Sequence, residues 1–276
     1  ALGRYTVFPT CVSATVPKDT FDFGELEHLP EINIAFDSRV TCYVETVKMM
    51  NLGLPRSVLR GAYVTGPYSL AGLIIGSDEA AMATMLQPEE FERLCEFVTE
   101  TIQQYVRLLI AAGAQVICVL EPSAVMLGPR QFEQYSARYV AHIVTSCRYS
   151  GLNTIYHTCG NTMHVIDQMV GAGVDGVSLD SADAGVDLPA IAARLPEDVA
   201  VIGNINPATT MLYGNRQKVE CEVRALLEAM EPYPNFILST GCDLPQETPL
   251  ENIHAFMNVG RGYRCNRPVA ATNASS

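Results

Sequence analysis

The chain has 276 residues, 48% hydrophobic and 17% charged, which is long and apolar enough to fold around a sizeable core. Its 18 Lys and Arg against 30 Asp and Glu give a formal charge of −12, which argues against nucleic acid or an anionic membrane as partner. No run of about 18 uncharged apolar residues occurs and the N-terminus lacks the layout of a signal peptide, so we expect a cytoplasmic protein without a membrane span.

Short apolar runs alternate with amphipathic stretches from residue 58 onward. The runs are rich in β-branched residues and apolar on both faces, which is typical of strands in a buried parallel sheet. The predicted strands cover residues 58–65, 115–121, 153–159, 176–180, 199–205 and 235–241, and a weaker candidate lies at residues 5–11.

The intervening helices follow from apolar residues at 3.6-residue spacing. Residues 88–112 carry one such stripe, with Pro88 suited to the first turn and Gly113 to the stop. Residues 216–230 repeat the pattern. The segment from Thr248 to Glu251 predicts a capping box that opens the last helix.

Six or seven alternating units imply either a TIM barrel or a doubly wound sheet. No Gly-rich dinucleotide fingerprint follows the first strand, and polar candidates follow several different strands, which a barrel gathers at one face. We therefore predict an α/β protein with a TIM (β/α)8-type barrel as its single catalytic domain over residues 1–265. The count falls short of eight, so the first unit is expected to be missing or degenerate near the N-terminus. Residues 266–276 are expected to form a flexible tail.

Polar residues at two strand ends suggest a metal site. His157 and Cys159 end one predicted strand and point the same way, although a buried polar pair at a strand end explains them equally well. Cys242 follows the last strand. One imidazole and two thiolates form a three-ligand set with room for a fourth partner, as in catalytic zinc, and sulfur favours zinc over magnesium or calcium.

Four of the remaining cysteines and two acidic residues have simpler interpretations as well. Four cysteines are expected to act as apolar fillers of the interior: Cys95, Cys118, Cys147 and Cys221. Asp180, at another strand end, is a candidate fourth ligand or base, and Glu121 competes for that catalytic role. Either carboxylate is also explained as a solvated or helix-capping acid.

Two segments carry a resemblance to a known family: residues 157–162 (HTCGNT) and 238–245 (LSTGCDLP) are similar to the methylcobamide:coenzyme M methyltransferases. These belong to the uroporphyrinogen decarboxylase superfamily of TIM barrels. Further matches lie at residues 65–70, 121–124, 128–129, 176–180 and 203–207, and the likeness runs from about residue 36 to 262.

The resemblance implies Zn²⁺ held by His157, Cys159 and Cys242, with Asp180 as the acid that completes the shell. Three residues flank these ligands and form the expected cofactor-binding set, orienting the ligands through hydrogen bonds: Asn161, Thr162 and Asp243.

The activity implied is methyl transfer from a methylcobalamin-type corrinoid, carried by a separate corrinoid protein, to a small thiol such as coenzyme M. Three alternatives stay open. In the first, the fold and metal are the same and the acceptor is tetrahydrofolate or homocysteine. In the second, the chain is a uroporphyrinogen decarboxylase, against which the cysteine motifs argue. In the third, the chain retains zinc and binds a corrinoid protein without turnover. Neither the acceptor nor the oligomeric state follows from the sequence.

Overall fold

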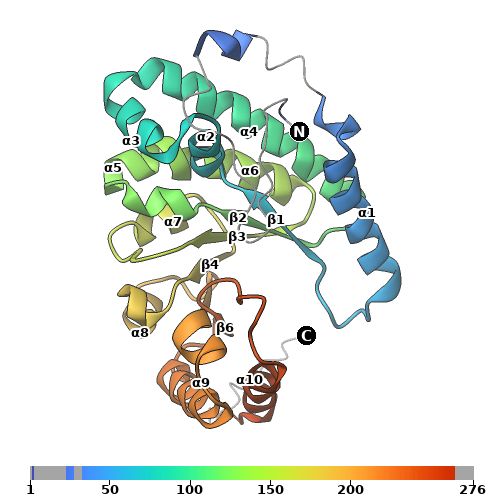
Figure 1. The fold of residues 1–276 in the computed structure, drawn as a ribbon, viewed down its shortest axis with the longest axis vertical. Helices are drawn as coiled ribbons and strands as arrows, with labels where there is room; N and C mark the ends of the chain where they lie inside the picture. The colour runs from blue at the N-terminus through green and yellow to red at the C-terminus, as the bar shows by residue number, and fades with distance from the viewer. Residues whose placement is uncertain (1, 3–22, 28–32, 265–276) are drawn as a thin grey trace, which may run out of the picture.

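A single parallel sheet runs through the computed structural model, which describes residues 2, 23–27 and 33–264 (Figure 1). Its six strands pair in the order in which they occur along the chain, and every pair is parallel. The strands are β1 (Gly61–Thr65), β2 (Val116–Leu120), β3 (Asn153–Thr158), β4 (Gly176–Leu179), β5 (Ala200–Ile205) and β6 (Phe236–Thr240).

This topology confirms the predicted fold class, because each strand returns to its neighbour through a helical segment, as in a TIM-type barrel. All six predicted strands form, with ends shifted by at most three residues. Within the described residues no pairing joins β6 back to β1. The weaker strand candidate at residues 5–11 and the tail at 266–276 lie outside the described residues.

Helices cover the sheet, and Figure 1 shows α1 to α7 grouped on one side of it and α9 and α10 packed together at the other end of the molecule. None of the described helices is both long and apolar enough to cross a membrane. The helical segments are η1 (Phe23–Glu27), η3 (Ile34–Phe36), α1 (Ser38–Gly53), α2 (Pro67–Ile75), α3 (Ser77–Leu86), α4 (Pro88–Ala111), η4 (Pro122–Met126), α5 (Pro129–Phe132), η5 (Glu133–Ala137), α6 (Arg138–Tyr149), α7 (Ile166–Gly171), η6 (Ala182–Ala184), α8 (Leu188–Ala192), η7 (Pro207–Leu212), α9 (Arg216–Met230) and α10 (Leu250–Gly262).

Two helices follow the sequence pattern closely. Pro88 occupies the first turn of α4, and Gly113 lies just beyond the last turn with a φ of +96°, which favours glycine. Helix α9 has the predicted bounds, and Asn215 caps it by accepting a hydrogen bond from the backbone N–H of Lys218. The apolar stripe of α4 is buried.

The predicted capping box of the last helix is wrong. Helix α10 begins at Leu250, and Pro249 stands at its N-cap with an extended ψ of 130°, so Thr248 lies outside the helix. The Thr248 hydroxyl is buried without a hydrogen-bond partner among the described residues. Instead, the Asn252 side chain donates to the carbonyls of Met211 and Gly214, which ties α10 to η7 and to the turn before α9.

Buried apolar residues form two clusters. The larger fills the space between the sheet and the helices from α1 to α8. The smaller lies between the end of β5, η7, α9 and α10 and consists of Ile205, Met211, Val219, Val223 and Ala255. Three of the four cysteines expected in the interior are buried, but Cys221 is exposed on α9, because it lies on the face away from this cluster.

Candidate metal centre

Three side chains from two distant strands converge at the carboxyl ends of the sheet. His157 is on β3, Cys159 directly follows β3, and Cys242 follows β6. The Cys159 Sγ lies 3.4 Å from the His157 Nε2 and 3.6 Å from the Cys242 Sγ, and the Cys242 Sγ lies 3.9 Å from the same Nε2. Among the described residues, these three form the one group with metal-binding geometry.

The separations fit a tetrahedral ion. Zn–S bonds of about 2.3 Å and Zn–N bonds of about 2.0–2.1 Å place tetrahedral ligand atoms about 3.5–3.8 Å apart. The three measured distances lie within a few tenths of an ångström of that range. The side chains therefore need little movement to hold a metal and leave one coordination position for another ligand.

The imidazole of His157 is oriented from behind by Ser178. Its Nδ1 atom lies 3.1 Å from the Ser178 carbonyl oxygen and 3.1 Å from the Ser178 hydroxyl. Donation from Nδ1–H to the carbonyl leaves the Nε2 lone pair directed at the two sulfur atoms. Sequence reasoning missed Ser178, although the parallel register pairs it with His157 and makes it the inward-facing neighbour on the next strand.

The pKa values of the two thiols are shifted in opposite directions. The hydrogen bond from Cys159 is the largest cause that lowers the pKa of the Cys242 thiol below its ordinary value. The same hydrogen bond, together with burial, raises the pKa of Cys159 well above its ordinary value. Cys242 is thus the more easily ionised of the two thiols, and a bound cation would favour loss of the proton from both.

Asp180 lies beside this group but is engaged elsewhere. Its carboxylate accepts hydrogen bonds from the backbone N–H groups of Gly160, at 2.7 Å, and Ser181, at 2.6 Å. Gly160 has a φ of +78°, which favours glycine and marks a sharp turn after Cys159. Because Asp180 accepts from the N–H of Gly160, it stabilises this turn. These two donors fix the orientation of the carboxylate, and each oxygen keeps a further lone pair.

Glu121 is directed away from the metal group. It is fully buried, and its carboxylate accepts hydrogen bonds from the backbone N–H groups of Tyr68 and Ser69, at 2.9 and 2.7 Å, in the first turn of α2. The hydroxyl of Ser136 donates to the same carboxylate. Burial raises the pKa of Glu121 to about 7 despite these donors. The geometry corresponds to the helix-capping alternative.

The three residues expected to orient the ligands differ in position. Asn161 is exposed, and its side chain accepts from the backbone N–H of Met163. Thr162 is buried, and its hydroxyl has no hydrogen-bond partner among the described residues. Neither side chain bonds to a ligand in this structure. The backbone N–H of Asp243, however, contributes to the lowered pKa of Cys242, and Asp243 lines the adjoining cavity.

That cavity has a volume of about 650 Å³ and is lined by residues of the sheet. The ligand group forms part of its wall. Apart from His157, Cys159 and Cys242, its lining consists mainly of apolar and uncharged side chains from all six strands and the loops that follow them: Gly61, Ala62, Tyr63, Val116, Cys118, Leu120, Pro122, Ile155, Ser178, Ile202, Ser239, Thr240, Asp243 and Leu244.

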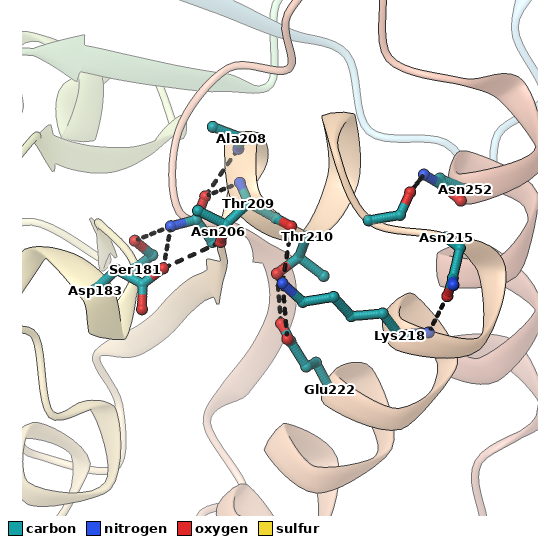
Figure 2. Close-up of polar contacts among 11 residues, drawn as sticks. Ser181, Asp183, Asn206, Ala208, Thr209, Thr210, Asn215, Lys218, Glu222 and Asn252 are labelled. Atoms are coloured by element: carbon teal, nitrogen blue, oxygen red, sulfur yellow. Dashed lines mark hydrogen bonds and ion pairs between the residues drawn. The ribbon is translucent and has the colours of Figure 1, made fainter.

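A polar network fixes the loops after β4 and β5 next to this site (Figure 2). The Asn206 side chain accepts from two backbone N–H groups of η7 and donates to the Asp183 carboxylate at 2.6 Å and the Ser181 hydroxyl at 3.3 Å. Ser181 in turn lies against Gly241, where an added Cβ would be 2.5 Å from the Ser181 nitrogen. The network therefore supports the turn that presents Cys242.

A parallel α/β fold with a His/Cys/Cys group at its carboxyl end defines a class of barrel enzymes. The model of the uroporphyrinogen decarboxylase (URO-D) family matches residues 1–263, so the chain belongs to that family.

Curated relatives carry two different functions. The methylcobamide:CoM methyltransferase MtbA of Methanosarcina mazei is 26% identical over 244 residues, which is 87% of this chain and 69% of that protein. The uroporphyrinogen decarboxylase of Synechococcus sp. is 30% identical over 207 residues, which is 72% of this chain and 57% of that protein. The chain is thus shorter than both relatives.

Solved structures agree on the fold. A methyltransferase from Methanosarcina mazei superposes with a TM-score of 0.82 at 20% identity, covering 94% of this chain and 75% of that one. A B12-independent methionine synthase from Shewanella sp. W3-18-1, in complex with selenomethionine, superposes with a TM-score of 0.61 at 15% identity, covering 79% and 66%. These similarities support the barrel-type architecture.

Proposed function

We propose that this chain is a zinc-dependent methyltransferase that moves a methyl group from a methylcorrinoid protein to a small thiol, of which coenzyme M is an example. The observation that carries the proposal is the convergence of His157, Cys159 and Cys242 at the wall of a cavity large enough for a substrate. A URO-D relative with a methylcobamide:CoM methyltransferase name supports it.

The donor set suits zinc, because two sulfur ligands and one imidazole are the ligands that this ion accepts in open catalytic sites. When bound, Zn²⁺ would lower the pKa of an incoming thiol and keep it as a nucleophilic thiolate. Ser178 holds His157 in the tautomer that offers Nε2. Asp180 holds the turn that sets the position of Cys159.

In the overall reaction, a sulfur–carbon bond forms while the cobalt–carbon bond breaks. The electron pair of that bond remains on cobalt, which becomes cobalt(I), and the proton of the thiol goes to solvent. The corrinoid is too large for the cavity alone, so it is expected to approach on its carrier protein at the carboxyl ends of the strands.

The test is metal content and methyl transfer in wild type, Cys242→Ala and Cys221→Ala, the last a control because Cys221 is exposed on α9. We expect one zinc per chain and cobalt(I) release from free methylcobalamin with a thiol in wild type and the control, and loss of both in Cys242→Ala. Zinc without methyl transfer to any thiol would favour another acceptor or a non-catalytic corrinoid partner. A folded wild type that binds no zinc would return the uroporphyrinogen decarboxylase interpretation to first place.

A further inference from the structure

The described lining of the cavity beside the metal group lacks the positive charge that would bind an anionic substrate. Of the described residues that line it, none is Lys or Arg, and Asp243 is the one carboxylate. Coenzyme M is 2-mercaptoethanesulfonate, and uroporphyrinogen carries several carboxylates. Either anion would meet an apolar wall and a carboxylate of its own sign, without a cation to pair with.

Asp243 is well placed to recognise a substrate. Asp243 directly follows the proposed ligand Cys242 in the chain, and both residues line the same cavity. The side chain is exposed and lines the cavity, and it forms no hydrogen bond or ion pair among the described residues. Its charge reaches the cavity wall, because it contributes to the raised pKa values of Cys118 and Tyr63, for both of which burial is the larger cause.

The other described residues of the cavity lining carry no carboxylate, so Asp243 is the main polar group for substrate recognition. Ile155 and Ile202 line the cavity from the middle of their strands and Leu120 from the end of β2. The hydroxyls of Ser239 and Thr240 are uncharged. Taking up a cationic group would therefore give Asp243 a partner and place the short carbon chain of the ligand against apolar side chains.

We propose that the methyl acceptor is a short aminothiol, whose sulfur takes the open metal position and whose ammonium group pairs with Asp243. This inference rests on the proposed function, because it assigns the substrate class of the same site. It makes Asp243 a specificity-determining residue and gives it a role beyond orienting the ligands.

Three two-carbon thiols that differ only in the charge at the other end test the proposal: 2-mercaptoethylamine, 2-mercaptoethanol and 2-mercaptoethanesulfonate. Their affinities for the zinc-loaded protein at neutral pH are measured by isothermal titration calorimetry, which requires no turnover. We expect the amine to bind about fivefold more tightly than the alcohol, and the alcohol about fivefold more tightly than the sulfonate, as partly exposed ion pairs and repulsions of about 1 kcal/mol give.

Two variants with the same loss of charge locate the effect. Asp243→Asn is expected to abolish the preference for the amine, whereas Asp198→Asn, an exposed control that does not line the cavity, is expected to preserve it. Equal affinities in wild type, tighter binding of the sulfonate, no binding of any thiol, or an unchanged preference in Asp243→Asn would each overturn the proposal.

A parallel assay with free methylcobalamin separates this inference from the proposed function. If the amine binds preferentially but no thiol is methylated, the proposed function fails while the assignment of Asp243 stands. If methyl transfer proceeds but the sulfonate binds best, the proposed function stands and the aminothiol assignment fails.

Discussion

The Nδ1 atom of His157 lies 3.1 Å from both the carbonyl oxygen and the hydroxyl oxygen of Ser178 on the neighbouring strand. Two polar atoms of one residue thus fix the direction of a ring whose other nitrogen faces two thiols. Because a parallel ladder holds Ser178 in register with His157, the sheet itself sets the orientation of the proposed ligand.

Removing the hydroxyl of Ser178 should weaken metal binding without removing the site. In Ser178→Ala the backbone carbonyl still accepts from Nδ1, so we expect a loss of about tenfold in zinc affinity, the lower end of the range for such outer contacts. Competition with a coloured chelator measures it. Ser239→Ala is the matched control, because Ser239 lines the same cavity without contacting His157. An equal loss in both variants would count against the orienting role.

Metal removal should leave the two proposed cysteine ligands open to oxidation. Their sulfur atoms are 3.6 Å apart, so hydrogen peroxide is expected to join Cys159 and Cys242 in a disulfide, with peroxide reduced to water and two hydrogen atoms lost from the protein. Peptide mapping by mass spectrometry after chelation identifies the bond. Zinc-loaded protein should resist the reaction. The same rate of disulfide formation with and without zinc would contradict zinc ligation by these thiols.

Glu121 should make stability fall as the pH rises. Its pKa in the fold is about 7, above the value of 4.5 for a free carboxyl, so the unfolded chain loses this proton first. The free energy of unfolding should therefore decrease by about 3 kcal/mol between about pH 4.5 and pH 7, a difference that Glu121→Gln should remove. Urea unfolding at several pH values measures it.

An exposed carboxyl provides the control for that experiment, since Glu247→Gln changes the same charge at a loop position. The two variants should diverge in the slope of stability against pH. If Glu121→Gln steepens the fall of stability with pH, the N–H donors of α2 outweigh burial and the pKa of Glu121 lies below that of a free carboxyl.

Gly241 should tolerate no side chain. An added Cβ would lie 2.5 Å from the Ser181 nitrogen and 2.9 Å from the Asp180 carbonyl carbon, both backbone atoms that cannot move independently. Gly241→Ala is expected to cost about 1–3 kcal/mol in the free energy of unfolding and to lower metal content, because Cys242 is adjacent. Gly171→Ala, at the end of α7 with open space around it, should be neutral or stabilising. Thermal denaturation and metal analysis of both variants measure these changes in stability and metal content.

Much of the fold was predictable because buried parallel strands have a strong local signature. Runs such as residues 115–121 are apolar on both faces, and this pattern does not depend on which strand comes next. The parallel arrangement then brings strand ends together, so the proximity of Cys159 and Cys242 followed from topology. The metal itself remains our proposal.

The features that sequence reasoning missed depend on contacts between distant segments. For Glu121 the sequence left a catalytic and a helix-capping role open, and the N-terminus of α2, more than fifty residues earlier, decides for capping. Thr248 satisfies the spacing of a capping box, but the extended backbone of Pro249 places the start of the helix beyond it. Ser178 becomes visible only when the register between β3 and β4 is known.

The proposed metal ligands come from parts of the fold that pack around different hydrophobic clusters. His157 lies on β3, a strand of the larger cluster, and Cys159 directly follows it. Cys242 follows β6, whose Leu238 packs with α9 and α10 against the smaller cluster. A bound ion would tie the two halves of the chain together across the sheet. Its loss would then lower the energy of a local opening in which β6 and α10 detach while the rest stays folded. Residence time of the metal and hydrogen exchange of residues 236–262 would thus report one and the same event.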